Sequence, residues 1–136
     1  MDMGHQWSNN LPSTGDNPRE ECVNDMYGIF NCGFDLAGNL LNHLYGFYIG
    51  QRDITYRKDD SKFLVIDQSK YSNKSDAKLL DHGFLYVPNF CETNECPILI
   101  FFHGCNFSAK SKGSKPTRNS GLLNYASKNN LVILFP

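Results

Sequence analysis

The stretch Ile98-Leu99-Ile100-Phe101-Phe102-His103-Gly104-Cys105 is the most informative part of this 136-residue chain. An unbroken apolar run followed by a small His-Gly pair is typical of a buried strand that ends in a tight turn. Glycine lets the backbone bend sharply there and aim its amide groups, and such amides stabilise negative charge that develops on a substrate oxygen. The stretch therefore predicts a buried strand that delivers a backbone N–H to a reaction centre.

The surrounding sequence predicts an α/β sheet. Strand character is found in four apolar stretches, at 63–66, 84–87, 97–102 and 131–135. Residues 121–127 between the last two strands have helical character. A strand, a His-Gly turn, a helix and a second buried strand form a βαβ crossover, so we expect a βαβ core with a His-Gly-Cys turn over residues 83–136.

A short helix is predicted upstream of this core, over residues 36–45. Its leucines fall on one helical face, Asp35 is a good N-cap, and Gly46 is a natural residue to end the helix. Residues 6–31 are rich in Asn, Pro, Gly and acidic residues and lack periodicity, so they predict an irregular loop.

The composition is that of one globular domain over residues 1–136. The chain is 40% hydrophobic and 20% charged, with a formal net charge of −1, and its basic residues form no extended patch. Nucleic acid and an acidic membrane are therefore not expected partners. The basic run at 110–115 predicts a solvated loop. Neither a signal peptide nor a membrane span is visible in the sequence.

Five cysteines favour an oxidising compartment. Cys22 and Cys32 flank one loop, and Cys91 and Cys96 flank another, so two local disulfides are expected if the geometry permits. Half of a zinc site at the second pair is an alternative, although no partner ligands stand at zinc spacing. Neither a metal nor a cofactor is predicted.

Several segments resemble the polyhydroxybutyrate depolymerase family, which are secreted esterases with an α/β-hydrolase fold. The similar segments are Met3-Gly4-His5, Cys32–Gly46, Gly83–Pro88 with Cys91 and Cys96, His103-Gly104-Cys105, and Asn129–Pro136. The resemblance implies a partial α/β-hydrolase fold with a mixed or parallel sheet and flanking helices. It also implies an extracellular protein.

The resemblance assigns candidate catalytic residues. His5 is the candidate general base, the backbone N–H of Cys105 is the candidate oxyanion donor, and Gly104 forms the oxyanion turn, with His103 structural. No Gly-x-Ser-x-Gly nucleophile motif occurs in the chain. Some family members resemble circular permutations, which would put the serine and aspartate of the triad before Met1. The expectation is therefore a fragment that lacks the upstream half of its domain and any signal peptide.

The function implied is hydrolysis of ester bonds in a polyhydroxyalkanoate, with a small soluble ester as another possible substrate. By itself, the chain is expected to be inactive. A non-catalytic secreted binding module of α/β-hydrolase descent is the alternative. The Cys105 thiol has two further interpretations, as a nucleophile that would need a partnered base, or, by the resemblance, as half of a disulfide to a later cysteine.

Overall fold

The computed structural model describes residues 6–10, 28–46, 62–71, 79–104 and 107–136. The strands are β1 (Gln6–Asn9), β2 (Gly28–Asn31), β3 (Phe63–Asp67), β4 (His82–Tyr86), β5 (Ile98–Ile100) and β6 (Val132–Phe135). The helices are α1 (Leu36–Tyr45), α2 (Ala109–Lys112), α3 (Lys115–Asn119) and α4 (Leu122–Asn129), with a 3₁₀-helix at Asn89–Glu92.

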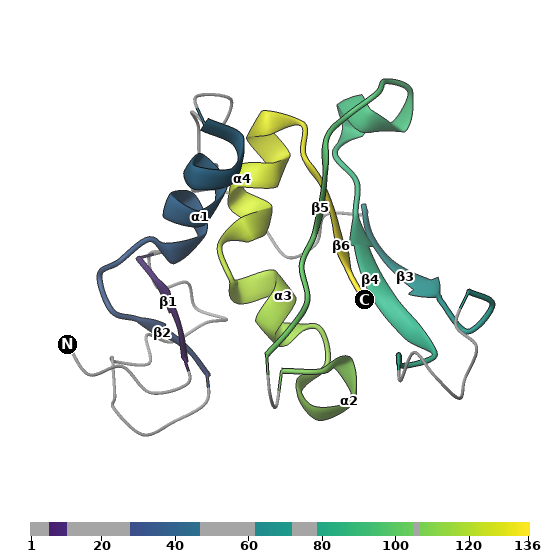
Figure 1. Cartoon of the computed structure of the whole chain (residues 1–136), viewed down its shortest axis with the longest axis horizontal. Coiled ribbons are helices and arrows are strands. Elements are labelled where there is room, and N and C mark those ends of the chain that lie inside the picture. Colours follow the sequence, from purple (N-terminus) through teal and green to yellow (C-terminus); the bar gives the residue numbers. More distant parts are fainter. Residues whose placement is uncertain (1–5, 11–27, 47–61, 72–78, 105–106) are drawn as a thin grey trace.

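A mixed four-stranded sheet forms the centre of the fold, with the strand order β3-β4-β6-β5. Strand β5 runs parallel to β6, whereas β4 is antiparallel to both β3 and β6. Helices α2, α3 and α4 connect β5 to β6, which makes the predicted βαβ crossover (Figure 1). The predicted mixed sheet with flanking helices is confirmed.

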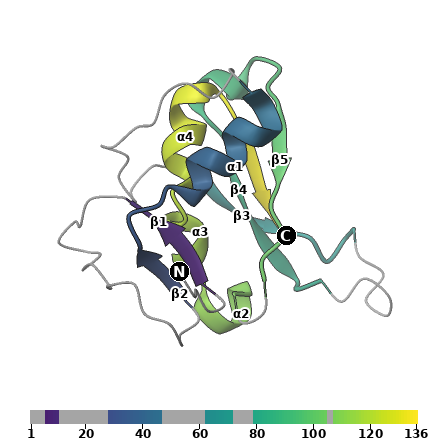
Figure 2. The same cartoon turned by 60° about the vertical axis from the view of Figure 1, so that its left-hand side comes forward.

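The expectation of an irregular loop over residues 6–31 is wrong at both of its ends. Strands β1 and β2 pair in parallel there, with Trp7 opposite Ile29, and they lie side by side apart from the larger sheet (Figure 2). A parallel pair needs a long connection between its strands. The pairing is therefore remote in sequence and has no local signal, and residues 11–27 of the same range lie outside the described residues.

The core lies between the four-stranded sheet and two helices. Helix α4 packs against β6, and α1 packs against α4 (Figure 1). Leu122, Leu123 and Ala126 of α4 and Leu41 of α1 are each 0% exposed. Because an amphipathic helix gains most of its stability from such burial, this packing holds α1 and α4 in place.

Helix α1 begins and ends as the sequence predicts. The Asp35 side chain caps its first turn by accepting a hydrogen bond from the N–H of Gly38 at 2.9 Å, and Gly46 ends the helix with a φ of 60°. The second oxygen of the Asp35 carboxyl accepts a 2.7 Å hydrogen bond from the hydroxyl of Tyr125. One carboxylate thus caps α1 and joins it to α4.

Substitution of Gly38 by Ala should destabilise the protein, although alanine normally favours a helix by about 1 kcal/mol. A Cβ at Gly38 would overlap the Tyr125 hydroxyl and lie 2.8 Å from the Tyr125 Cζ atom and 2.9 Å from the Asp35 Oδ2 atom. Overpacking of this kind costs about 1–3 kcal/mol, so the net effect should be a loss, measured by urea denaturation. Adding Tyr125→Phe should recover part of that loss; equal stability of G38A and the wild type would contradict the close approach.

The basic run at 110–115 is exposed, as expected of a solvated segment, but it is not simply a loop. Ala109–Lys112 forms α2, whose N-cap Ser108 accepts a hydrogen bond from the N–H of Ser111, and α3 begins at Lys115. Helices this short carry too little periodicity to be recognised from sequence. No helix in the described part of the chain is long and apolar enough to cross a membrane.

Strand β5 differs from the prediction in its burial. Only Leu99 is buried, at 8% exposed, whereas Ile98 and Ile100 are 53% and 50% exposed. The prediction of a fully buried strand is therefore wrong for this chain. The physical reason is its position, since β5 is at one edge of the sheet and helices cover only one of its two faces.

Candidate functional site

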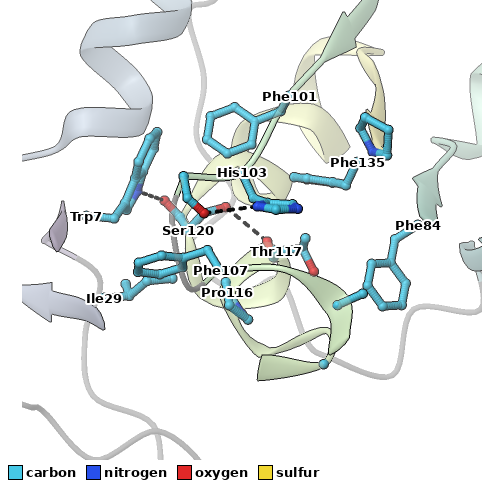
Figure 3. A pocket seen from close by; sticks show the side chains of 14 residues that line it. Trp7, Ile29, Phe84, Phe101, His103, Phe107, Pro116, Thr117, Ser120 and Phe135 are labelled. Carbon is cyan, nitrogen blue, oxygen red and sulfur yellow. Dashed lines mark hydrogen bonds between the residues drawn. The ribbon is translucent and has the colours of Figure 1, made fainter. Parts of the chain in front are cut away.

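A cavity of about 240 Å³ lies beyond the carboxyl ends of the parallel strands β5 and β6 (Figure 3). Phe101, His103 and Gly104, which follow β5, form part of its wall, and Phe135 and Pro136 form another part at the end of β6. In open α/β sheets, ligands bind outside the carboxyl ends of the strands. The cavity thus occupies the position at which this class of fold places its sites.

Aromatic rings from three different elements form the inner wall. Trp7 of β1 meets the Phe101 ring edge to face with centroids 5.2 Å apart, and Phe101 meets Phe135 of β6 at 5.9 Å. Such edge-to-face contacts add to the energy of burying the rings. They fix the wall by joining the small sheet to the end of the larger one.

The polar side chains in the wall are already hydrogen-bonded within the protein. The Thr117 hydroxyl donates to the carbonyl oxygen of Ser114 at 2.7 Å, and the Ser120 hydroxyl donates to the carbonyl oxygen of Thr117 at 2.9 Å. The Trp7 indole N–H donates to the carbonyl oxygen of Ser120 at 2.7 Å. Each hydroxyl thus donates to a carbonyl oxygen and not to a base of the described residues, so neither is arranged there as a nucleophile. The wall is left mainly apolar and suits an apolar ligand group.

The His103-Gly104 turn is held by hydrogen bonds to one carbonyl oxygen. The Gly104 oxygen lies 3.0 Å from Nδ1 of His103 and accepts a hydrogen bond from the N–H of Phe107 at 3.2 Å. Because a carbonyl oxygen only accepts, Nδ1 of His103 carries the proton in this contact. The arrangement agrees with a structural role for the His103 side chain.

The backbone conformation at residue 104 does not require a glycine. The sequence had suggested that Gly104 is there to let the backbone bend sharply. Among the described glycines, the positive φ angles belong to Gly33, Gly46, Gly113 and Gly121, not to Gly104. A Cβ added at Gly104 would meet no atom within 4 Å. The missing side chain instead leaves open space at this point of the cavity wall.

The remaining predicted site residues divide into two groups. His5, Cys22 and Cys105 lie outside the described residues, so their roles stay predictions. Cys91 and Cys96 form the expected disulfide, with 5.7 Å between their Cα atoms, which excludes the zinc alternative for this pair because a disulfide offers no thiolate. Cys32 is also disulfide-bonded.

No group of three or more His, Cys, Asp or Glu side chains that could hold a metal occurs in the part of the chain that the structure describes.

The sequence did not indicate most of the cavity wall. Trp7 and Ile29 come from β1 and β2, far along the chain from the His-Gly turn, and Pro116 comes from the short helix α3. The chain has a single tryptophan, and this was the one available signal, because a buried tryptophan in a polar segment requires a partner for its N–H.

Comparison with known proteins gives a consistent result. No family model matches the chain. It is 31% identical over 111 residues to a poly(3-hydroxybutyrate) depolymerase of Delftia acidovorans and 33% identical over 110 residues to a polyhydroxybutyrate depolymerase of Talaromyces funiculosus. Each match covers 79% of this chain, but only 22% and 31% of the two relatives.

Solved structures agree with these sequence relatives. The PHB depolymerase of Penicillium funiculosum has a TM-score of 0.74 at 28% identity, and a PHB depolymerase variant complexed with an R3HB trimer has a TM-score of 0.78 at 28% identity. Both matches cover 99% of this chain and 41% of the solved chains. The chain is therefore a homologue of the polyhydroxybutyrate depolymerases and spans less than half the length of those it matches.

Proposed function

We propose that this chain forms part of the active site of a secreted serine esterase that hydrolyses the ester bonds of a polyhydroxyalkanoate or a related ester. The observation that carries the proposal is the position of the His103-Gly104 turn on the wall of an apolar cavity beyond the carboxyl ends of β5 and β6. An oxyanion donor must lie beside the site that holds the substrate carbonyl. The place of the turn on the cavity wall supports the assignment of the oxyanion donor to this turn.

The proposed division of work follows from what ester hydrolysis needs. A serine mechanism requires a nucleophile, a base that takes its proton, a carboxylate that orients the base, and oxyanion donors. This chain would supply the base, His5, and one donor, the backbone N–H of Cys105. The serine and the carboxylate would come from another part of the protein, because no Gly-x-Ser-x-Gly motif occurs in these 136 residues.

Two contacts support these assignments. Trp7, two residues after His5 in the sequence, is hydrogen-bonded to the cavity wall at the carbonyl oxygen of Ser120. The carbonyl of Gly104, which precedes Cys105, is held by the N–H of Phe107 and by Nδ1 of His103. In the sequence, both candidate groups therefore stand within two positions of residues that line the same cavity.

The apolar wall favours the acyl part of an ester as the occupant. Its polar groups are satisfied internally at Thr117 and Ser120, so the wall gains most from apolar atoms removed from water. Methyl-bearing hydroxyacyl units, such as those of the R3HB trimer bound by the related depolymerase, have this character. The Cys91–Cys96 disulfide supports a location outside the cell.

Binding of an R3HB trimer to the whole chain tests the cavity. Trp7 is the chain's single tryptophan and lines the cavity, so its fluorescence should change as the trimer binds. Ala109→Phe would place a ring at the wall and should weaken binding at least about tenfold, since a filled cavity excludes the ligand. Lys110→Phe adds the same ring to an exposed neighbour outside the wall and should bind normally. Equal affinity of both variants would remove the cavity from the proposal.

A further inference from the structure

One nitrogen in the cavity wall has no hydrogen-bond partner among the described residues. The polar side chains of the wall are those of Trp7, His103, Thr117 and Ser120. The Trp7 indole and the two hydroxyls each donate their proton to a carbonyl oxygen of the protein. His103 differs because its ring has two nitrogens, and only Nδ1 is hydrogen-bonded within the described part of the chain. Its Nε2 atom is therefore left for a ligand.

The contact made by Nδ1 determines the chemical character of Nε2. Nδ1 of His103 lies 3.0 Å from the carbonyl oxygen of Gly104. That oxygen can only accept a hydrogen bond, so a neutral imidazole carries its proton on Nδ1. The partner of one ring nitrogen sets the protonation of the other in this way. A neutral His103 thus presents Nε2 as a hydrogen-bond acceptor.

This acceptor lies in apolar surroundings. Figure 3 shows the imidazole pointing from the turn into the space that Phe101, Phe135 and Thr117 surround, with the unbonded nitrogen at its far end. His103 is exposed in the free chain, so water can bind Nε2 there. An apolar ligand that enters the cavity displaces this water, and affinity is lost unless the ligand replaces its hydrogen bond. The cavity therefore favours a ligand with an apolar body and one hydrogen-bond donor.

A hydroxyalkanoate chain has such a donor at one end only. Its ester linkages carry oxygens that accept hydrogen bonds and donate none, and the carboxylate at one end also only accepts. The hydroxyl at the other end is the single donor. In the R3HB trimer that the related depolymerase binds, a methyl group stands beside this hydroxyl and suits the apolar wall.

We propose that His103 is a specificity-determining residue, whose Nε2 accepts a hydrogen bond from the terminal hydroxyl of a hydroxyalkanoate chain held in the apolar cavity. This inference rests on the function proposed above. It gives the two ring nitrogens separate tasks, since Nδ1 holds the turn and Nε2 binds the substrate. An acyl chain without the hydroxyl would leave Nε2 unpaired and would bind more weakly.

Of the two hydroxyl oxygens in the wall, that of Thr117 is the stronger rival acceptor. The Ser120 oxygen already accepts a 3.3 Å hydrogen bond from the N–H of Leu122, and Ser120 is only 3% exposed. The Thr117 oxygen donates its proton to the carbonyl oxygen of Ser114 but keeps its lone pairs. The test must therefore distinguish His103 from Thr117.

Two trimers that differ by one oxygen atom test the proposal. The probes are the R3HB trimer and the deoxy trimer, in which a hydrogen replaces the terminal hydroxyl. Each is titrated into the whole chain at about pH 8, where an ordinary histidine is neutral, and Trp7 fluorescence reports binding. The R3HB trimer should bind about three- to tenfold more tightly, as expected for one hydrogen bond to a neutral acceptor. Equal affinities would overturn the role of His103 but leave the cavity as an acyl site, whereas failure of both trimers to bind would overturn both proposals.

Amide substitutions separate the two ring nitrogens of His103. The amide of Asn can replace Nδ1 as the donor to Gly104 but leaves nothing at Nε2, whereas the longer Gln can place its oxygen where Nε2 lies. His103→Asn should bind both trimers with the affinity of the wild type for the deoxy trimer, within about twofold, and His103→Gln should keep the preference for the hydroxyl. The reverse pattern, or an equal loss of affinity for both trimers in His103→Asn, would show that the side chain acts only through the turn.

Two control variants locate the effect. His43→Asn makes the same change on the exposed side of α1 and should keep the full preference for the hydroxyl. Thr117→Val removes the rival oxygen and should also keep it. A preference that is lost in Thr117→Val and kept in His103→Asn would assign the hydroxyl to Thr117 and overturn the proposal.

Nitrogen NMR of the whole chain gives a readout that does not depend on affinity. The chain has four histidines, and the signals of His103 are those missing from the His103→Asn spectrum. In the free wild-type chain at about pH 8, where an ordinary histidine is neutral, Nε2 of His103 should have the chemical shift of an unprotonated nitrogen. This shift should move further with the R3HB trimer than with the deoxy trimer. A proton on Nε2 in the free chain, or equal shifts with the two trimers, would overturn the proposal.

Discussion

Ester hydrolysis by a single-chain fusion of this protein with the unmatched part of a related depolymerase should fall by about 10⁶-fold when His5 is replaced by Ala. An imidazole is suited to take the serine proton and return it to the leaving group near neutral pH. Without it, only binding and oxyanion stabilisation remain, and these leave a small residual rate. The measurement is the rate at which monomer is released from the R3HB trimer, at saturating and at subsaturating concentrations of the trimer.

His43→Ala is the matched control for the His5 variant. His43 lies on the exposed side of α1, away from the cavity wall, and its loss should leave the rate within about twofold, as is usual for surface substitutions. Near-normal turnover in His5→Ala would remove His5 from the mechanism. A fusion that binds the trimer but shows no turnover even with His5 in place would favour the non-catalytic binding module.

Replacing Leu123 by Ala should lower the free energy of unfolding by about 2–5 kcal/mol. Leu123 is 0% exposed on α4, in the helix that lies between β6 and α1. The substitution removes apolar contacts and leaves a cavity that the neighbouring strands and helix can only partly close. Denaturation in urea, followed by the fluorescence of Trp7, measures the loss.

Leu44→Ala provides the comparison, because it removes the same atoms from a side chain that is 54% exposed on α1. Its cost should stay within about 0.5 kcal/mol. Similar losses in the two variants would contradict the placement of α4 between the sheet and α1. The comparison also separates true core packing from a change in helix propensity, which is the same for both substitutions.

Local signals were sufficient for much of the fold. The leucine spacing between Asp35 and Gly46 predicted α1, and four apolar stretches predicted β3 to β6, with ends that differ by at most two residues. These features depend on residues that are near neighbours in the chain. The resemblance to the depolymerases rested on short motifs around Gly46 and His103, and the sequence relatives bear it out.

The features that were not predicted depend on contacts between distant residues. Trp7 faces Ser120 across 113 residues, and nothing in either segment indicates the other. The pairing of β1 with β2 is of the same kind. The prediction that β5 is buried was wrong for a different reason. Ile98 and Ile100 are residue types typical of a strand covered on both faces, and the structure of this chain covers only one face. Exposure depends on the neighbouring layers, which the strand's own sequence does not reveal.

The position of β6 in the sheet has a consequence for synthesis on the ribosome. Val132–Phe135 is the last strand of the chain, yet it lies between β4 and β5 and joins them. Within the four-stranded sheet, only the β3–β4 hairpin can therefore form while the nascent chain is still short of residue 132. Until then, β5 has no partner among these strands and exposes its apolar side chains to chaperones or to other nascent chains.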